Sequence, residues 1–177
     1  LAVSCGCNAG LFHEALHEVY IPRIQRGNAS FAANILGARG ALLSVLVHFF
    51  EHGNWRSPLE IGSGEQRLTA EDQLFILMQA AVYLSVTRGM QAPEVRICHE
   101  RAVPLCHSLN RTDLLYVALV GQWRYSLVTG KLTATLRIAE RIYSLAQEQK
   151  DAASLIKAHM ALAATLYYLG NFESARQ

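Results

Sequence analysis

The stretch Leu166-Tyr167-Tyr168-Leu169-Gly170-Asn171-Phe172 decides the fold, because it has the form of a helix that ends in a tight turn. Glycine adopts the left-handed backbone conformation at little cost, and helices commonly end at a residue in that conformation. Three other apolar stretches end in the same way, at Gly53, Gly89 and Gly130. The four glycines are 36, 41 and 40 residues apart, which indicates a repeated unit of two helices.

Apolar residues between these glycines recur at intervals of three and four, which is typical of helices that bury one face. No segment shows the sustained alternation of a half-buried strand. Thr69 followed by Asp72 has the form of a helix start, and Pro93 suits a first helical turn. We expect helices at 10–26 (bent or ended near Pro22), 38–52, 72–88, 93–108, 113–128, 131–149 and 153–169, a further helix from Asn171, and a loop over 56–68.

A helical pair cannot bury its apolar face alone, but stacked neighbours can, so the sequence predicts an all-α array of helix-turn-helix repeats. We expect residues 1–177 to form a single helical-repeat domain that is a fragment of a longer protein. Its expected parts are an N-terminal helix region at 1–37, a degenerate first repeat with a loop at 38–68, and regular repeats at 69–177.

The composition limits the possible functions. The formal net charge is +2, from 16 basic and 14 acidic residues, which argues against nucleic-acid binding through bulk charge. Charged residues make up 17% of the chain, fewer than the roughly 25% of an average domain, so part of the surface is expected to be apolar and to face a partner. No apolar stretch is long enough to span a bilayer. Four cysteines do not form a disulfide framework, so we expect a reducing, cytoplasmic setting.

Residues 162–175 carry a small residue at Ala163, a turn at Gly170, an aromatic residue at Phe172 and another small residue at Ala175. This pattern is similar to that of the tetratricopeptide repeat. More broadly, residues 70–177 resemble the helical-repeat region of large bacterial signalling ATPases, through Ala92-Pro93-Glu94-Val95, Gln122-Trp123-Arg124-Tyr125 and Leu166-Tyr167-Tyr168-Leu169-Gly170. The resemblance implies a right-handed α-α superhelix that serves as an interaction or sensing arm, without catalytic residues or a cofactor. It also places Ala163 at a close contact between helices.

The concave face of such an array is lined by the first helix of each pair. Tyrosine and arginine on that face are residue types enriched where proteins dock, so a protein or peptide, or a neighbouring domain of the parent chain, is the expected partner. The candidate groove residues are Gln79, Tyr83, Tyr116, Gln122, Arg124, His159 and Tyr167. Two alternatives stay open. The tyrosines and Trp123 are core residues whose polar atoms face water, or a small ligand binds between helix pairs. Exposed repeat ends would allow self-association.

His13-Glu14-Ala15-Leu16-His17 has the H-E-x-x-H form of zinc proteases. On a helix this spacing places both imidazoles on one face, with a glutamate that can activate a zinc-bound water. No third ligand follows at the spacing of the metzincins, although a distant carboxylate such as Glu51 could complete the set. The alternative is an exposed helix face, and we expect no metal at His13 and His17.

The cysteines offer two further metal hypotheses. Cys98 and Cys106, with Ala102 between them, are spaced at four residues and are better explained as small core residues of one helix. Cys5 and Cys7 could form a chelating pair, although we expect them to lie at a disordered end of the chain. The sequence therefore predicts a non-catalytic protein without a cofactor.

Overall fold

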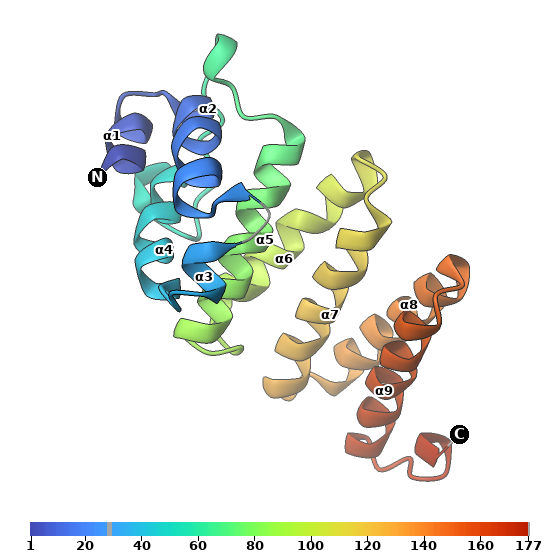
Figure 1. The fold of residues 1–177 in the computed structure, drawn as a ribbon. Helices are drawn as coiled ribbons and strands as arrows, with labels where there is room; N and C mark the ends of the chain where they lie inside the picture. Colours follow the sequence, from blue (N-terminus) through green and yellow to red (C-terminus); the bar gives the residue numbers. More distant parts are fainter. Residues whose placement is uncertain (28–29, 177) are drawn as a thin grey trace. The chain divides into compact units, whose positions relative to one another are not determined.

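The computed structural model describes residues 1–27 and 30–176, and over these ranges the chain consists of helices joined by turns and loops (Figure 1). The prediction of an all-α protein is confirmed. Within the described ranges, β-type pairing is limited to one antiparallel bridge between Phe50 and Leu59. The chain divides into two compact units, Leu1–Gly89 and Met90–Gln177.

The first unit begins with α1 (Ala2–Asn8), which corrects the expectation that the N-terminal residues are disordered. Val3 and Cys7 are buried on α1, which packs against η1 (Ala15–Ile24) and η3 (Val47–Phe49). Gly6 explains the close approach to the next segment, because a methyl group there would lie 3.0 Å from the Cβ atom of Ala15.

A regular α-helix over 10–26 is not observed. The segment forms α2 (Phe12–Glu14) and then η1, a π-helix that contains Pro22 and ends with a hydrogen bond from the Gln25 amide to the Tyr20 carbonyl. The wider π-helical turn accommodates a proline, which has no amide hydrogen to donate. The short helix α3 (Phe31–Asn34) follows.

The predicted helix at 38–52 is also shorter than expected. It consists of α4 (Arg39–Leu46), followed by the 3₁₀ turns η3 and η4 (Glu51–Gly53). The chain becomes extended at Phe50, which pairs with Leu59 and contacts the ring of Trp55 at a centroid distance of 4.9 Å. Phe50 is 1% exposed in this conformation, and burial of its ring offsets the loss of the helical hydrogen bonds.

The central helix of the first unit is α5 (Ala70–Thr87), which packs on α4 and buries residues around most of its circumference. Its start confirms the sequence signal, because the Thr69 hydroxyl accepts from the Asp72 amide while the Asp72 carboxylate accepts from the Thr69 amide. The preceding segment is the expected loop, and it contains the bridge residue Leu59 and the short 3₁₀ turn η5 (Gly64–Gln66).

The second unit consists of α6 (Pro93–Ser108), α7 (Thr112–Val128), α8 (Leu132–Gln149) and α9 (Ala152–Tyr168), whose bounds agree with the sequence prediction to within one residue. Each helix packs on the next one in the chain, as Figure 1 shows for this part. Small residues at these contacts, such as Ala118, Ala139 and Ala158, have no exposed surface and allow the helices to approach closely.

A left-handed residue closes the turn that follows each of these helices. Gly130 and Gly170 have the positive φ angles expected from the sequence, 72° and 80°. The other two turns use Asn110 and Lys150, with φ angles of 53° and 54°, so their positions carry no glycine signal.

The end of the chain differs from the prediction in its last element. The segment from Asn171 forms only the 3₁₀ turn η6 (Ser174–Arg176) instead of a further α-helix. Ala163 is half-buried beside a cavity of about 300 Å³, while Ala158, Ala161 and Thr165 are the buried residues of α9. Ala163 is therefore less buried than its neighbours Ala158 and Ala161, which have little or no exposed surface on α9.

Candidate functional site

The H-E-x-x-H residues lie at the junction of α2 and η1, and each has a protein partner. The rings of His13 and His17 stack at a centroid distance of 4.4 Å, and His17 Nε2 lies 2.7 Å from Asp72 Oδ1. The Glu14 carboxylate accepts from the Gln66 side-chain amide, whose own oxygen accepts from the Glu14 backbone amide. These contacts connect the segment to the start of α5 and to the preceding loop.

The structure offers no metal centre at this segment. Over residues 1–27 and 30–176, no group of three or more His, Cys, Asp and Glu side chains is arranged to hold a metal ion. Burial alone would raise the pKa of Asp72, but hydrogen bonds from Thr69 and His17 outweigh burial and hold the pKa below its ordinary value of 3.8. Asp72 therefore acts as an ionised helix cap that also binds His17.

The burial of Cys98 and Cys106 distinguishes between the two interpretations of these residues. Cys98, Ala102 and Cys106 have almost no exposed surface, which confirms their interpretation as core residues. Burial raises the pKa of the Cys98 thiol to about 12, so this sulfur stays protonated. His99 is also buried, and its Nδ1 has no hydrogen-bond partner among the described residues.

Gly121 explains how the His99 ring fits between α6 and α7. A Cβ atom at position 121 would lie 2.1 Å from His99 Nε2, so only glycine leaves room for the imidazole. Burial, with a smaller effect from the Arg124 charge, lowers the pKa of His99 from 6.5 to about 4. The ring is therefore neutral near pH 7.

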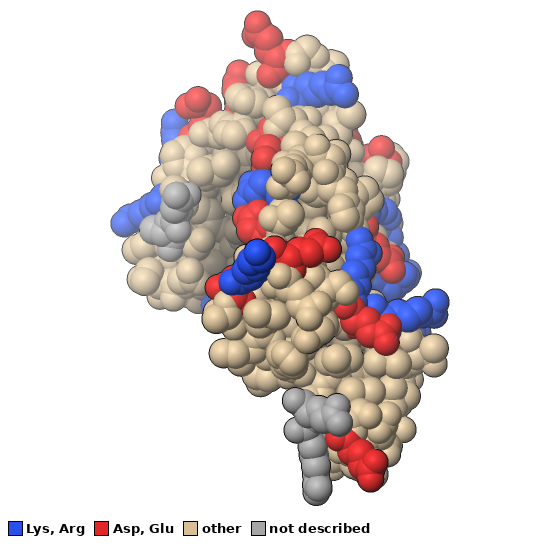
Figure 2. All heavy atoms as spheres, turned by 90° about the vertical axis from the view of Figure 1, so that its right-hand side faces the viewer, with Lys and Arg blue, Asp and Glu red and all other residues tan. Residues whose placement is uncertain are grey.

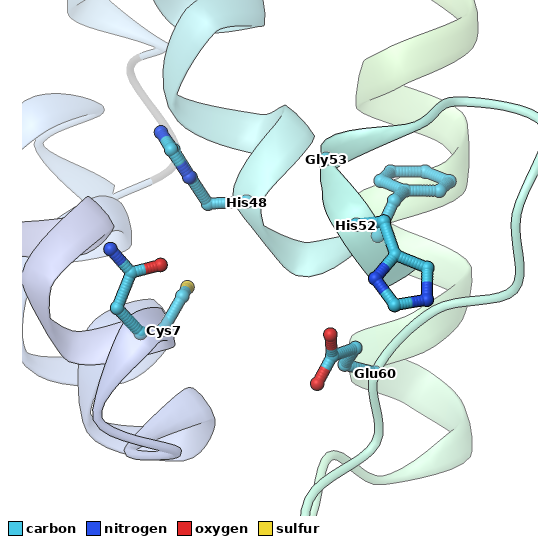
Figure 3. A pocket seen from close by; sticks show the side chains of 7 residues that line it. Cys7, His48, His52, Gly53 and Glu60 are labelled. Atoms are coloured by element: carbon cyan, nitrogen blue, oxygen red, sulfur yellow. The ribbon is translucent and has the colours of Figure 1, made fainter.

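A polar cavity of about 530 Å³ lies in the first unit, where α1 faces the turns after α4 (Figure 3). Cys7, His48, His52 and Glu60 line it together with Asn8 and Phe50. His52 has a φ angle of 56°, a conformation that costs energy for a residue with a side chain. Burial, followed by the Glu60 charge, raises the pKa of the Cys7 thiol to about 12, so this thiol is not a nucleophile.

A second cavity of about 490 Å³ lies in the second unit, between α7 and α9. Two hydrogen bonds join the helices along it. The Tyr116 hydroxyl donates to the Ser154 carbonyl at 3.2 Å, and Trp123 Nε1 donates to Thr165 Oγ1 at 2.9 Å. The spacing of these bonds along both helices shows that α7 and α9 run in the same direction. We call this cavity the α7–α9 groove.

The α7–α9 groove has an apolar floor and a cation near each end. Val117 is 45% exposed and Met160 is 66% exposed, so apolar side chains of both helices reach solvent here. Arg124 and Lys157 are both exposed on the rim. No carboxylate is among the described residues that line the groove, which are Tyr116, Val117, Val120, Trp123 and Arg124 from α7 and Lys157, Met160, Ala161 and Ala164 from α9.

The residues of the two walls are offset by a constant number of positions in the sequence. Val117 and Lys157, Val120 and Met160, and Arg124 and Ala164 are each separated by 40 residues, the spacing from Gly130 to Gly170. The groove is thus formed by α7 and α9, whose lining residues share this constant offset in the sequence. Val117 and Met160 are groove residues that the sequence pattern does not predict, because an exposed apolar residue on a helix has the same local pattern as a core residue.

The structure brings together only part of the predicted groove set. Tyr116 and Arg124 line the α7–α9 groove, whereas Gln122 is half-buried on α7 outside it. His159 lies on another face of α9, with its ring 4.9 Å from that of Tyr143, and Tyr167 is exposed in an aromatic cluster with Tyr168 and Phe172.

The two predicted groove residues on α5 are not in this cavity. Gln79 is half-buried on α5. Tyr83 is a correction, because it is 2% exposed and its hydroxyl accepts from Gln25 Nε2, which also donates to Tyr20. This network is a polar part of the first unit's core, where burial raises the pKa of both tyrosines.

Comparisons with protein-family models, with curated proteins and with solved structures give no match for this chain. Among the described residues, no helix has the length and apolar character required to cross a membrane. On the face drawn in Figure 2, basic and acidic side chains are interspersed over a largely uncharged surface. We take the α7–α9 groove as the candidate site because its lining residues and the two hydrogen bonds between its walls define it directly.

Proposed function

We propose that the chain is a non-catalytic protein-interaction module and that the α7–α9 groove receives a segment of a protein partner. The observation that carries this proposal is the exposed apolar floor of the groove, which includes large side chains such as Met160. Continuous apolar surfaces that are exposed to water commonly mark sites where another protein binds. The hydrogen bonds at Tyr116 and Trp123 support it, since they fix the walls before a partner binds.

The proposal includes a tetratricopeptide-like superhelix as the architecture that presents the groove. Sequential packing of α6 to α9 and the constant 40-residue offset of the two walls support this proposal. In this account the chain acts as a scaffold arm of a larger cytoplasmic signalling protein of bacterial type, and the partner is another protein or a neighbouring domain.

A peptide-display selection on the full chain tests the proposed function. Ala164→Phe fills the groove with an aromatic ring, and Ala153→Phe adds the same ring to an exposed position of α9 outside the groove. We expect selected peptides to bind the wild-type chain and Ala153→Phe equally and to lose at least tenfold in affinity for Ala164→Phe, whose fold is checked by circular dichroism. Peptides that bind all three chains equally would refute the proposal.

The polar cavity of the first unit supports a second candidate function, the binding of a small ligand. Asn8, His48, His52 and Glu60 converge on one space, and the strained backbone at His52 is typical of functional positions. With the Glu60 carboxylate and further side-chain oxygen and nitrogen atoms on its walls, the cavity suits a small amine. A panel of amino acids and polyamines should raise the melting temperature of the wild-type chain but not of Glu60→Gln, and a panel without effect contradicts this candidate.

A further inference from the structure

We infer that the partner segment of the α7–α9 groove is an acidic amphipathic helix, an inference that rests on the proposed function. Such a helix has an apolar stripe flanked by two carboxylates on the same face. Charge complementarity favours an acidic partner, because the rim has Arg124 and Lys157 and lacks a carboxylate among its described lining residues. An acidic segment gains from both cations, whereas a basic one is repelled by them.

The positions of the two cations define the spacing of the carboxylates. Lys157 lies seven residues before Ala164 on α9, and Ala164 has the constant 40-residue offset from Arg124. Seven residues of helix correspond to about 10 Å along the groove. Two acidic residues at positions i and i+7 of a partner helix have the same separation and lie on one face.

The apolar floor favours a helical partner over an extended one. Val117 and Val120 on α7, and Met160 and Ala164 on α9, recur at intervals of three and four along their helices. A helix with apolar residues at i+3 and i+4 buries one continuous stripe against such a floor. An extended chain would instead turn every second side chain away from it.

Nearby charges change the attraction between the two cations and an acidic partner only slightly. Asp151 interacts with Lys157, but its carboxylate also accepts from the amide and hydroxyl of Ser154, at 2.8 and 2.6 Å, where it caps α9. Arg124 forms no salt bridge with another described residue. Both cations are exposed, so their effect on binding should weaken as salt is added.

Three labelled helical peptides test the inference on the full chain by fluorescence anisotropy. They share leucine at i+3 and i+4 and carry glutamate, glutamine or lysine at both i and i+7. At low salt, we expect the glutamate peptide to bind about tenfold more tightly than the glutamine peptide and the lysine peptide to bind most weakly. A fourth peptide, with both glutamates moved to the opposite face, should bind like the glutamine peptide.

The double variant Arg124→Gln with Lys157→Gln is the matched control. It should bind the glutamate and glutamine peptides equally, because it keeps the apolar floor and removes the cations. Groove binding in which glutamine or lysine peptides equal the glutamate peptide would overturn the acidic-helix inference and leave the interaction function intact. Binding that Ala164→Phe does not weaken, or no binding by any peptide, would overturn both.

Discussion

Replacing Gly121 by alanine should destabilise the second unit, although alanine is the better helix former. In an isolated helix the substitution would gain about 1 kcal/mol. In α7 the new methyl group would lie 2.1 to 2.5 Å from three ring atoms of His99, where ordinary carbon contacts need about 3.5 Å or more. The ring is only 6% exposed, so it cannot retreat by about 1 Å without moving its neighbours.

Overpacking of this kind costs about 1–3 kcal/mol, and values at the upper end follow when the obstacle is a buried ring. After subtraction of the helix-propensity gain, we expect Gly121→Ala to lower the free energy of unfolding by about 1–2 kcal/mol. In a chain that already carries His99→Ala, the obstacle is absent, and the same substitution should be neutral or stabilising by up to about 1 kcal/mol.

The assay is urea denaturation of the wild type, both single variants and the double variant, followed by circular dichroism and by tryptophan fluorescence. All four chains carry Trp55→Phe in the first unit, so that the fluorescence of Trp123, two residues from Gly121 on α7, reports on the second unit. The reasoning predicts a coupling between the two substitutions of about 2 kcal/mol in favour of the double variant. Additive effects, or a Gly121→Ala chain as stable as the wild type, would refute the claim that the imidazole occupies the space above Gly121.

Three further predictions concern stability. Folding lowers the pKa of His99 from 6.5 to about 4, so the neutral ring contributes stability that is complete above about pH 6.5 and is lost as the pH falls toward 4. The loss amounts to up to about 3 kcal/mol. Urea midpoints at pH 7 and pH 4.5 should therefore differ less in His99→Gln than in the wild type, and equal differences would contradict the assignment. Asp72→Asn removes the ionised cap of α5 and the charged partner of His17, so it should lower the free energy of unfolding by about 1–2 kcal/mol, and a thermal melt that matches the wild type would argue against that role. Ala158→Leu should lower the free energy of unfolding by about 1–3 kcal/mol, because position 158 has no exposed surface. Ala163→Leu should leave the free energy of unfolding almost unchanged, because the larger side chain can enter the neighbouring cavity. Similar urea midpoints for the two variants would show that the contacts of α9 are misassigned.

The helices of the second unit could be predicted from the sequence because their signals are local. Pro93 begins α6, and Gly130 and Gly170 close turns, so each boundary is visible within a few residues. Even there, Asn110 and Lys150 take the left-handed conformation without a glycine, and the helix bounds follow from the apolar periodicity and from cap residues such as Asp151, which caps the start of α9.

The first unit was harder to predict because distant contacts decide its local structure. The residues from 47 to 53 continue a helical pattern, but pairing of Phe50 with Leu59 draws the chain into an extended form. The proline-containing π-helix and α1 likewise depend on packing, as the contact between Gly6 and Ala15 shows. No periodicity within a short window contains that information.

The candidate groove could be predicted in part. Tyr116 and Arg124 were expected from their residue types, and both line the α7–α9 groove. Val117 and Met160 were not expected, because an exposed apolar residue on a helix has the same local pattern as a core residue. Only the placement of α7 beside α9 distinguishes the two cases.

Methyl NMR of methionine tests most directly the claim that the α7–α9 groove binds a protein segment. The chain has three methionines, of which Met160 lies in the groove, while Met78 and Met90 lie outside it and serve as internal controls. Titration with the glutamate peptide should shift the Met160 methyl signal to saturation and leave the other two signals in place. A Met160 signal that stays fixed while the peptide binds would contradict the account.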